Sequence, residues 1–185
     1  MGKLVIISGP SGVGKDTIIE KIIQRNPQKY IRSLSATTRR PRPDEVPGVS
    51  YVFVSEDEFK KMRDEGKFLE WALVHGYYYG TLIDDVLNKL KADKNVILKI
   101  DVQGAAQVKL KYPQALSIFI MPPNDEQLEL RRRMRGIDDN EELRRIDAKD
   151  EIQRAQEYDY IVCNDELDRA VDEVIRLIEK AEGKS

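Results

Sequence analysis

One stretch of sequence decides the fold of this chain, LVIISGPSGVGK at residues 4–15. Its first residues are apolar and rich in β-branched side chains, which predicts a short buried strand over 3–8. A glycine-rich turn follows, and the isoleucines after it share one face of a helix from about 15 to 24. The turn Gly9–Lys15 fits the pattern G-x-x-x-x-G-K, whose glycines let backbone N–H groups turn inward around phosphate oxygens. Because strand, turn and helix occur in this order, we predict a phosphate-binding loop rather than an ordinary turn.

The loop is expected to hold the phosphates of ATP, with Lys15 reaching the phosphate that is transferred. We place these residues in the ATP site: Gly9, Pro10, Ser11, Gly12, Val13, Gly14, Lys15, Asp16 and Thr17. Position 16 departs from the usual pattern, in which a Ser or Thr hydroxyl holds Mg²⁺. The Asp16 carboxylate either binds the metal, directly or through water, or is an acid favoured by the helix dipole while Thr17 contacts phosphate. Mg²⁺ is the expected cofactor, and the residue that holds it stays open.

Strands and helices alternate along most of the remaining chain. Apolar and periodic patterns predict strands at 96–101, 116–121 and 160–162, and helices at 82–91, 104–110 and 167–182. A charged helical stretch covers 124–155 and is broken near Gly136. Residues 33–81 contain prolines and alternating aromatic residues, which predicts a small, mixed α+β insertion with a capping box at Ser55 and Glu58. The whole pattern predicts an α/β P-loop NTPase fold, a parallel sheet flanked by helices.

The composition excludes several other classes of protein. The 185 residues carry 31 basic and 33 acidic side chains, a formal net charge of −2, which argues against a general nucleic-acid coat. One Cys and one His exclude an internal disulfide framework and a metal site built from several of either residue. The sequence shows no signal-peptide pattern and no apolar run near the roughly 20 residues that span a bilayer. We therefore expect a soluble cytoplasmic protein that binds neither nucleic acid nor membrane, with Cys163 buried at a strand end.

Several separated motifs say more about the substrate than the loop does. They are SATTRRPRP at 35–43, GVSY at 48–51, EW at 70–71, GYYYGT at 76–81, IDVQG at 100–104 and EYDYIVCND at 157–165. With these motifs in this order, the chain resembles the guanylate kinases, a family of P-loop nucleoside monophosphate kinases, from residue 4 to about 165. The resemblance implies phosphorylation of GMP, and of dGMP, by ATP to give the nucleoside diphosphate and ADP, within purine nucleotide metabolism.

The same resemblance divides the single domain into three parts. These are a core (1–32, 82–123 and 156–185), a GMP-binding insertion (33–81) and a helical lid (124–155). It also implies a GMP site made of Ser35, Arg39, Arg42, Tyr51, Glu70, Tyr79, Gly80, Thr81 and Asp101. A carboxylate such as Glu70 accepts from both N1–H and the 2-amino group of guanine, and AMP would leave it unpaired. The hydroxyls of Ser35 and Thr81 suit guanine O6, and Asp101 is expected near the amino edge of the base.

Arginines are concentrated in the two segments that would close on the phosphates. Arg39 and Arg42 present planar forks that suit the GMP phosphate, and Tyr51 and Tyr79 complete this cradle. The lid resemblance adds arginines that stabilise charge during transfer. The predicted catalytic residues are Lys15, Arg39, Arg131, Arg135 and Arg145, with Arg144 left as an alternative to Arg145. Arg132 and Arg133 are instead interpreted as solvated residues of a charged helix.

A second departure from the family is Lys99, where guanylate kinases usually carry an acid that helps organise the metal. We hypothesise that Lys99 pairs with Asp16, which would be a charge exchange between two neighbouring functional positions. Two other functions stay open at this point. One is a non-catalytic guanylate-kinase-like binding module, and the other is a kinase similar to the ribose-bisphosphate kinases, which share the Gly-Lys-Asp run. We expect a monomer that binds ATP and GMP or dGMP, with a dimer left open.

Overall fold

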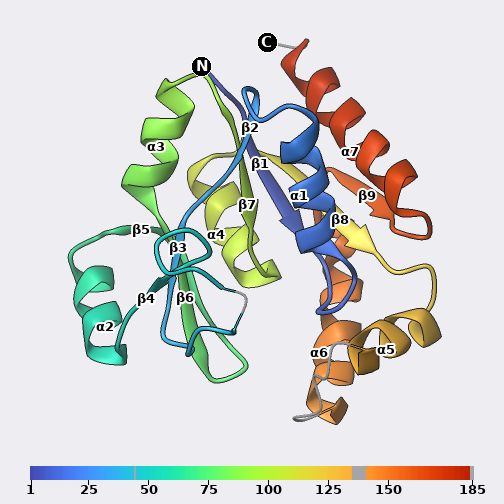
Figure 1. Cartoon of the computed structure of the whole chain (residues 1–185), viewed down its shortest axis with the longest axis horizontal. Coiled ribbons are helices and arrows are strands. Elements are labelled where there is room, and N and C mark those ends of the chain that lie inside the picture. The colour runs from blue at the N-terminus through green and yellow to red at the C-terminus, as the bar shows by residue number, and fades with distance from the viewer. Residues whose placement is uncertain (44, 135–140, 184–185) are drawn as a thin grey trace.

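The computed structural model describes residues 1–43, 45–134 and 141–183, and it consists of a core sheet, an insertion and a helical segment (Figure 1). In the described part of the chain, five parallel strands form the core sheet in the order β2-β7-β1-β8-β9. The strands are β2 (Tyr30–Arg32), β7 (Asn95–Lys99), β1 (Leu4–Ser8), β8 (Leu116–Met121) and β9 (Tyr160–Cys163). This order confirms the predicted parallel sheet, although β2 was not among the predicted strands.

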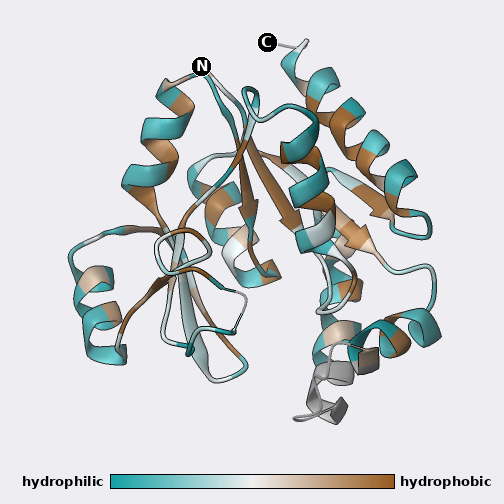
Figure 2. Cartoon of the chain, in the orientation of Figure 1, coloured by the Kyte–Doolittle hydropathy of each residue, from teal (hydrophilic) through white to brown (hydrophobic). Residues whose placement is uncertain are grey.

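Helices cover both faces of this sheet because its strands are apolar on both sides. The alternation of side chains along β1 sends Val5 and Ile7 to one face and Leu4 and Ile6 to the other. The first face packs against α1 (Lys15–Arg25) and α7 (Leu167–Glu182), and the second against α3 (Ile83–Lys91) and α4 (Val102–Lys111). Figure 2 shows the same arrangement, with hydrophobic strands inside and hydrophilic outer helix faces. The apolar strands thus hold the loop between β1 and α1 on a rigid base.

The insertion has a sheet of its own. Among the described residues this sheet has the order β4-β3-β6-β5, and its pairs are antiparallel except for β3 with β4. The strands are β3 (Ser35–Thr37), β4 (Val52–Phe53), β5 (Phe68–Val74) and β6 (Tyr77–Leu82). Helix α2 (Glu56–Asp64) begins at the predicted capping box, in which Ser55 and Glu58 bond each other's backbone N–H groups. Phe59 of this helix stacks on Phe68 at 4.5 Å between ring centroids, which joins the helix to its sheet.

The predicted charged stretch forms two helices, α5 (Asp125–Met134) and α6 (Glu141–Gln153), followed by the short 3₁₀ helix η1 (Arg154–Glu157). Figure 1 places these helices and the insertion at the same end of the core sheet, the end toward which β1 and β8 point. In open parallel sheets this carboxyl end is where ligands bind. None of the described helices is long and apolar enough to cross a membrane. One detail of the expected core is wrong, because Cys163 at the end of β9 is exposed.

Candidate active site

The phosphate loop begins where β1 ends and closes on the first turn of α1. Gly14 caps this helix at φ 102°, a left-handed conformation that a residue with a Cβ adopts only with strain. The Lys15 Nζ donates to the loop's own carbonyls, Gly9 O and, at 2.9 Å, Pro10 O. Burial lowers the pKa of Lys15 to about 8. A part-buried ammonium that donates to loop carbonyls is well placed to exchange them for phosphate oxygens.

Three side chains from later segments brace this loop. Asn164, which is buried after β9, donates from Nδ2 to Val13 O at 2.8 Å. Arg131 donates to Val13 O at 3.3 Å and to Asn164 O at 3.1 Å. Arg132 donates from Nε to Ser11 O at 2.8 Å and is only 5% exposed, so its interpretation as a solvated residue was wrong. The reason is tertiary, because helix α5 turns this side chain toward the loop, and the composition of one helix does not reveal that contact.

Helix α6 adds a carboxylate that the sequence patterns did not single out. Burial raises the pKa of Glu151 to about 7, opposed by attraction to Lys15. Among the described residues its buried Oε2 atom has no hydrogen-bond partner. Glu151 therefore faces the loop lysine as a counter-charge contributed by the predicted lid. A single acid in a charged helix gives no sequence signal for this role.

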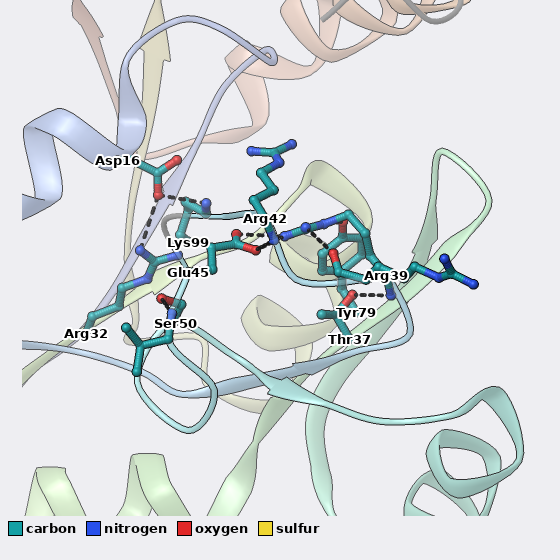
Figure 3. A network of polar contacts seen from close by, with 11 residues as sticks. Asp16, Arg32, Thr37, Arg39, Arg42, Glu45, Ser50, Tyr79 and Lys99 are labelled. Carbon is teal, nitrogen blue, oxygen red and sulfur yellow. Dashed lines mark hydrogen bonds and ion pairs between the residues drawn. The ribbon is translucent and has the colours of Figure 1, made fainter.

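The hypothesised pair of Asp16 with Lys99 is present. Lys99 Nζ lies 2.7 Å from Asp16 Oδ1, and Arg32 Nη1 lies 3.2 Å from the same oxygen (Figure 3). Burial would raise the pKa of Asp16, but Lys99 and Arg32 lower it to about 2, so the carboxylate stays ionised. Arg32 was missed because it lies on β2, the edge strand that the sequence did not predict. Figure 3 shows both cations pointing at one carboxylate.

The residues predicted to read guanine meet where the insertion joins the core. Glu70 on β5 is 3% exposed and accepts from Thr81 on β6, at 2.5 Å from the hydroxyl and 3.1 Å from the backbone N–H. The Thr81 hydroxyl also lies 3.5 Å from that of Ser35 on β3. The antiparallel pairing of β6 with both other strands creates this cluster, because it sets Thr81 opposite Ser35 and Glu70. Burial raises the pKa of Glu70 to about 7, so neutral pH divides it between charged and neutral forms.

Asp101 and Gly104 form the core side of the same site. Asp101 caps α4 by accepting from the Gly104 N–H at 3.0 Å, and it raises the pKa of Glu70 further by repulsion. A Cβ on Gly104 would lie 2.4 Å from Glu70 Oε2 and 3.3 Å from Asp101 Oδ1. The glycine therefore lets the two carboxylates converge. The structure thus places Asp101 close to Glu70, while its predicted position near the amino edge of guanine stays a prediction. The sequence did not assign a role to Gly104.

The predicted phosphate cradle is assembled only in part. Arg39 donates from Nε to the Tyr79 hydroxyl at 3.2 Å, and its Nη2 contacts both oxygens of Glu45 at 2.7 and 3.0 Å. The rings of Tyr51 and Tyr79 meet at 6.0 Å between centroids, and the Arg39 guanidinium lies 5.7 Å from the centre of the Tyr51 ring. Arg42 is exposed, and in Figure 3 its side chain points away from Arg39. Glu45, which was not predicted, thus occupies the fork that was assigned to phosphate.

Some predicted residues lie outside what the structure describes. Arg135 lies in the interval 135–140, and the side chains of Arg133, Arg144 and Arg145 are not described. The predicted lid therefore contributes Arg131, Arg132 and Glu151 to the site as described. Gly80 is buried on β6, where a Cβ would lie 2.7 Å from the Phe68 ring. The glycine therefore lets the Phe68 ring pack against the strand beside Thr81. Thr17 follows Asp16 in the first turn of α1 and is half-buried.

A phosphate loop joined to a second site with a buried acceptor for a base and an arginine cradle defines a P-loop nucleoside monophosphate kinase. The family model for guanylate kinase matches residues 1–181. The chain is 46% identical to the guanylate kinase of Caldanaerobacter subterraneus subsp. tengcongensis, over 96% of this chain and 86% of that one. It is 49% identical to the guanylate kinase of a Nostoc species, over 92% of this chain and 86% of that one. The chain belongs to the guanylate kinase family.

Solved structures agree with this assignment. The guanylate kinase of Anaplasma phagocytophilum superposes with a TM-score of 0.79 at 29% identity, covering 97% of this chain and 85% of that one. The SH3-kinase fragment of tight junction protein 3 superposes with a TM-score of 0.56 at 12% identity, covering 96% of this chain and 56% of that one. The second likeness shows the shared fold alone.

Proposed function

We propose that this chain transfers the γ-phosphoryl group of ATP to GMP, giving ADP and GDP. Family membership supports the proposal, and the observation that carries it is the buried Glu70 beside Thr81. Glu70 lies close to Gly104, which follows β7 at the same end of the parallel sheet as the phosphate loop after β1. An ionised Glu70 accepts from N1–H and the 2-amino group of guanine, and Ser35 and Thr81 offer hydroxyls to O6. Asp101 adds a carboxylate beside the amino edge. These contacts involve the base and not the ribose, so dGMP is proposed as a second substrate.

The phosphate of GMP is proposed to bind the cradle of Arg39, Arg42, Tyr51 and Tyr79. There it would displace Glu45 from the Arg39 guanidinium. Phosphate carries more negative charge than a carboxylate, so it binds the same planar N–H groups more strongly. One oxygen of this phosphate attacks the γ-phosphorus in line, the bond to the β-γ bridging oxygen breaks, and that oxygen leaves with ADP. Lys15 holds the ATP phosphates during this step. The side chains contribute positioning and charge stabilisation and form no covalent intermediate.

The proposed lid, 124–155, closes over the phosphates and excludes water. Arg131 and Arg132 already contact the phosphate loop, which supports a role for this segment during transfer. Arg135 and Arg145 are proposed to complete the set of catalytic arginines, with Arg144 the alternative to Arg145. The remaining division into a core and a GMP-binding insertion, 33–81, is part of the same proposal. A monomer that works in the cytoplasm, with a dimer as the alternative, is part of the same proposal.

Mg²⁺ is proposed to accompany ATP, as in other P-loop kinases. The side chain at the usual metal position does not fit as its ligand, because the Asp16 carboxylate is held by Lys99 and Arg32. The described residues also contain no group of three or more His, Cys, Asp or Glu side chains that could hold a metal. We propose that the ATP phosphates carry the metal, with a contact to Thr17 through water as the alternative.

A coupled assay of ADP formation tests the proposed function. ATP is offered with GMP, dGMP, AMP or a ribose bisphosphate, each in turn, and the nucleotide products are identified by chromatography. GMP and dGMP are expected to give the diphosphate, while AMP reacts at least about 10³-fold less efficiently, because it leaves Glu70 unpaired. Turnover with the ribose bisphosphate alone, or with no acceptor at all, would overturn the proposal.

A further inference from the structure

The carboxylate that follows the phosphate-loop lysine is engaged by two cations instead of a metal. In a P-loop the residue at this position supplies a hydroxyl ligand to Mg²⁺. Here Asp16 Oδ1 accepts from Lys99 Nζ at 2.7 Å and from Arg32 Nη1 at 3.2 Å (Figure 3). The side chains of Lys99 and Arg32 are only 19% and 27% exposed, so both ion pairs are partly shielded from water. Asp16 thus orients cations at the place where a metal ligand is expected.

Lys99 stands between the phosphate loop and the cradle proposed for the acceptor phosphate. It is the last residue of β7 and lies opposite Ile7 of β1, two residues before the loop begins at Gly9. On its other side its Nζ lies 5.9 Å from the centre of the Tyr51 ring. Arg39 faces the same ring at 5.7 Å. A phosphoryl group that passes from the loop to the cradle therefore passes close to Lys99.

The cations at this place repel one another in the free protein. Burial lowers the pKa of Lys15 and attraction to Glu151 opposes this, while repulsion from Lys99 and Arg132 lowers the pKa further and Asp16 compensates it in part. Three cations also surround the Tyr51 ring, because Arg32 lies 5.9 Å from its centre in addition to Lys99 and Arg39. Bringing like charges together is unfavourable unless anions compensate them. The charge of a bound triphosphate would compensate this cluster, which is therefore preorganised for an anion.

We propose that Lys99, held in place by Asp16 and Arg32, contacts the terminal phosphate of ATP and supplies part of the positive charge that other P-loop kinases take from the metal. Lys99 is thus a substrate-contacting residue, and Asp16 is a positioning residue and not a metal ligand. This inference deepens the proposed function and rests on ATP as the phosphoryl donor. It implies that ATP binds well to this chain even without Mg²⁺.

Calorimetric titration of ATP onto the full-length protein, once with EDTA and once with excess Mg²⁺, tests the inference without any turnover. The ratio of the two dissociation constants measures how strongly the metal and ATP are coupled. Lys99→Met is expected to weaken metal-free ATP about tenfold and MgATP less than about threefold, since the metal replaces the lost charge. Lys99→Arg keeps the charge and should restore metal-free binding. Asp16→Asn should raise the coupling ratio as Lys99→Met does, but to a smaller extent, since it loosens Lys99 and removes no metal ligand.

Lys109→Met is the matched control, because Lys109 also pairs with a half-exposed carboxylate, Asp159, but in the last turn of α4. It should leave both dissociation constants unchanged, and thermal unfolding checks that every variant folds. Equal weakening of both forms of ATP by Lys99→Met, or no weakening, would overturn the role of Lys99. A tenfold fall of the coupling ratio in Asp16→Asn would make Asp16 a metal ligand and overturn its positioning role. If the ratios behave as expected while GMP is not phosphorylated, only the proposed function fails.

Discussion

The phosphate loop and the insertion recognise their proposed ligands by different physical means. The loop is built from glycines and backbone groups, and distant side chains such as Asn164 and Arg132 bond its carbonyls. The insertion depends on side chains of its own sheet, above all the buried Glu70 with Thr81. Backbone N–H groups bind any phosphate, whereas a buried carboxylate distinguishes one base from another. Changes in the loop should therefore reduce phosphoryl transfer for every acceptor, and changes in the insertion should alter the choice of acceptor.

Replacement of Lys15 by Met gives the largest expected effect. It removes the ammonium that would hold the transferring phosphate, so kcat should fall by roughly 10³-fold for GMP and dGMP alike. The fold should persist, because an apolar chain of similar length replaces the ammonium, and Glu151, whose pKa is about 7, takes up a proton when its counter-charge is lost. Steady-state kinetics and thermal melting measure the two effects. A loss of activity confined to one acceptor would contradict the assigned role of the loop.

Replacement of Glu70 by Gln should break the selectivity of the insertion. The amide offers one acceptor where guanine needs two, so kcat/KM for GMP should fall by roughly 10²-fold or more. The binding of ATP should be unchanged, since Glu70 does not contact the phosphate loop. The ratio of kcat/KM for GMP to that for AMP is the informative measurement. If this ratio stays at its wild-type value, Glu70 does not read the base.

The difference between backbone recognition in the loop and side-chain recognition in the insertion explains what could be predicted from the sequence. The loop needs only a strand, glycines and a helix in order, so the run from Leu4 to Lys15 predicts both its fold and its ligand. The Glu70 site was found only because separated motifs together resemble a family. The roles of Arg132 and Glu45 were missed because they depend on contacts with other segments of the chain. The sequence of a charged helix or loop is the same whether its side chains make such contacts or point into solvent. The pair of Asp16 and Lys99 was predictable, since two unusual charges at neighbouring positions complement each other.

Gly104→Ala tests how tightly the core supports the insertion. The new Cβ would lie 2.4 Å from Glu70 Oε2, closer than such contacts occur, so the carboxylate must move away from its bond with Thr81. We expect KM for GMP to rise about tenfold while KM for ATP stays constant, because a displaced carboxylate loses one of its hydrogen bonds. Gly183→Ala is the control, since a Cβ there has only ordinary contacts at 3.8 Å. An unchanged KM for GMP would show that the Glu70 position is not needed for binding.

The ionisation of Glu70 gives the insertion a pH dependence that the loop does not share. Only the charged form accepts from both guanine donors, and the pKa in the free protein is about 7. KM for GMP should therefore rise about tenfold between pH 8 and pH 6. GMP phosphate also titrates near pH 6, so Glu70→Gln is measured in parallel. It should remove the part of the profile that centres near pH 7, and an identical profile in this variant would rule Glu70 out.

The same pKa affects stability with a definite sign. The pKa of Glu70 is raised from 4.5 in the unfolded chain to about 7 in the folded one, so the folded state binds more protons between these values. Stability should therefore fall as pH rises from about 5 to 8, because ionisation then costs more in the folded protein than in the unfolded one. Glu70→Gln should remove the Glu70 part of this decline, while Glu151, whose pKa is also raised to about 7, still contributes its own part. Chemical denaturation of both proteins at several pH values measures it.

Glu45→Gln should give the smallest effect and separates recognition of the acceptor phosphate from recognition of the base. Glu45 and Arg39 form an ion pair whose side chains are only 13% and 15% exposed, and Arg39 lowers the pKa of this carboxylate against the effect of burial. The phosphate of GMP must displace Glu45 from the Arg39 fork, and a neutral amide holds that fork less strongly. KM for GMP should therefore fall about two- to fivefold at constant kcat, while the preference for GMP over AMP stays unchanged because Glu70 is untouched. A rise in KM would mean that Glu45 instead positions Arg39 for the phosphate.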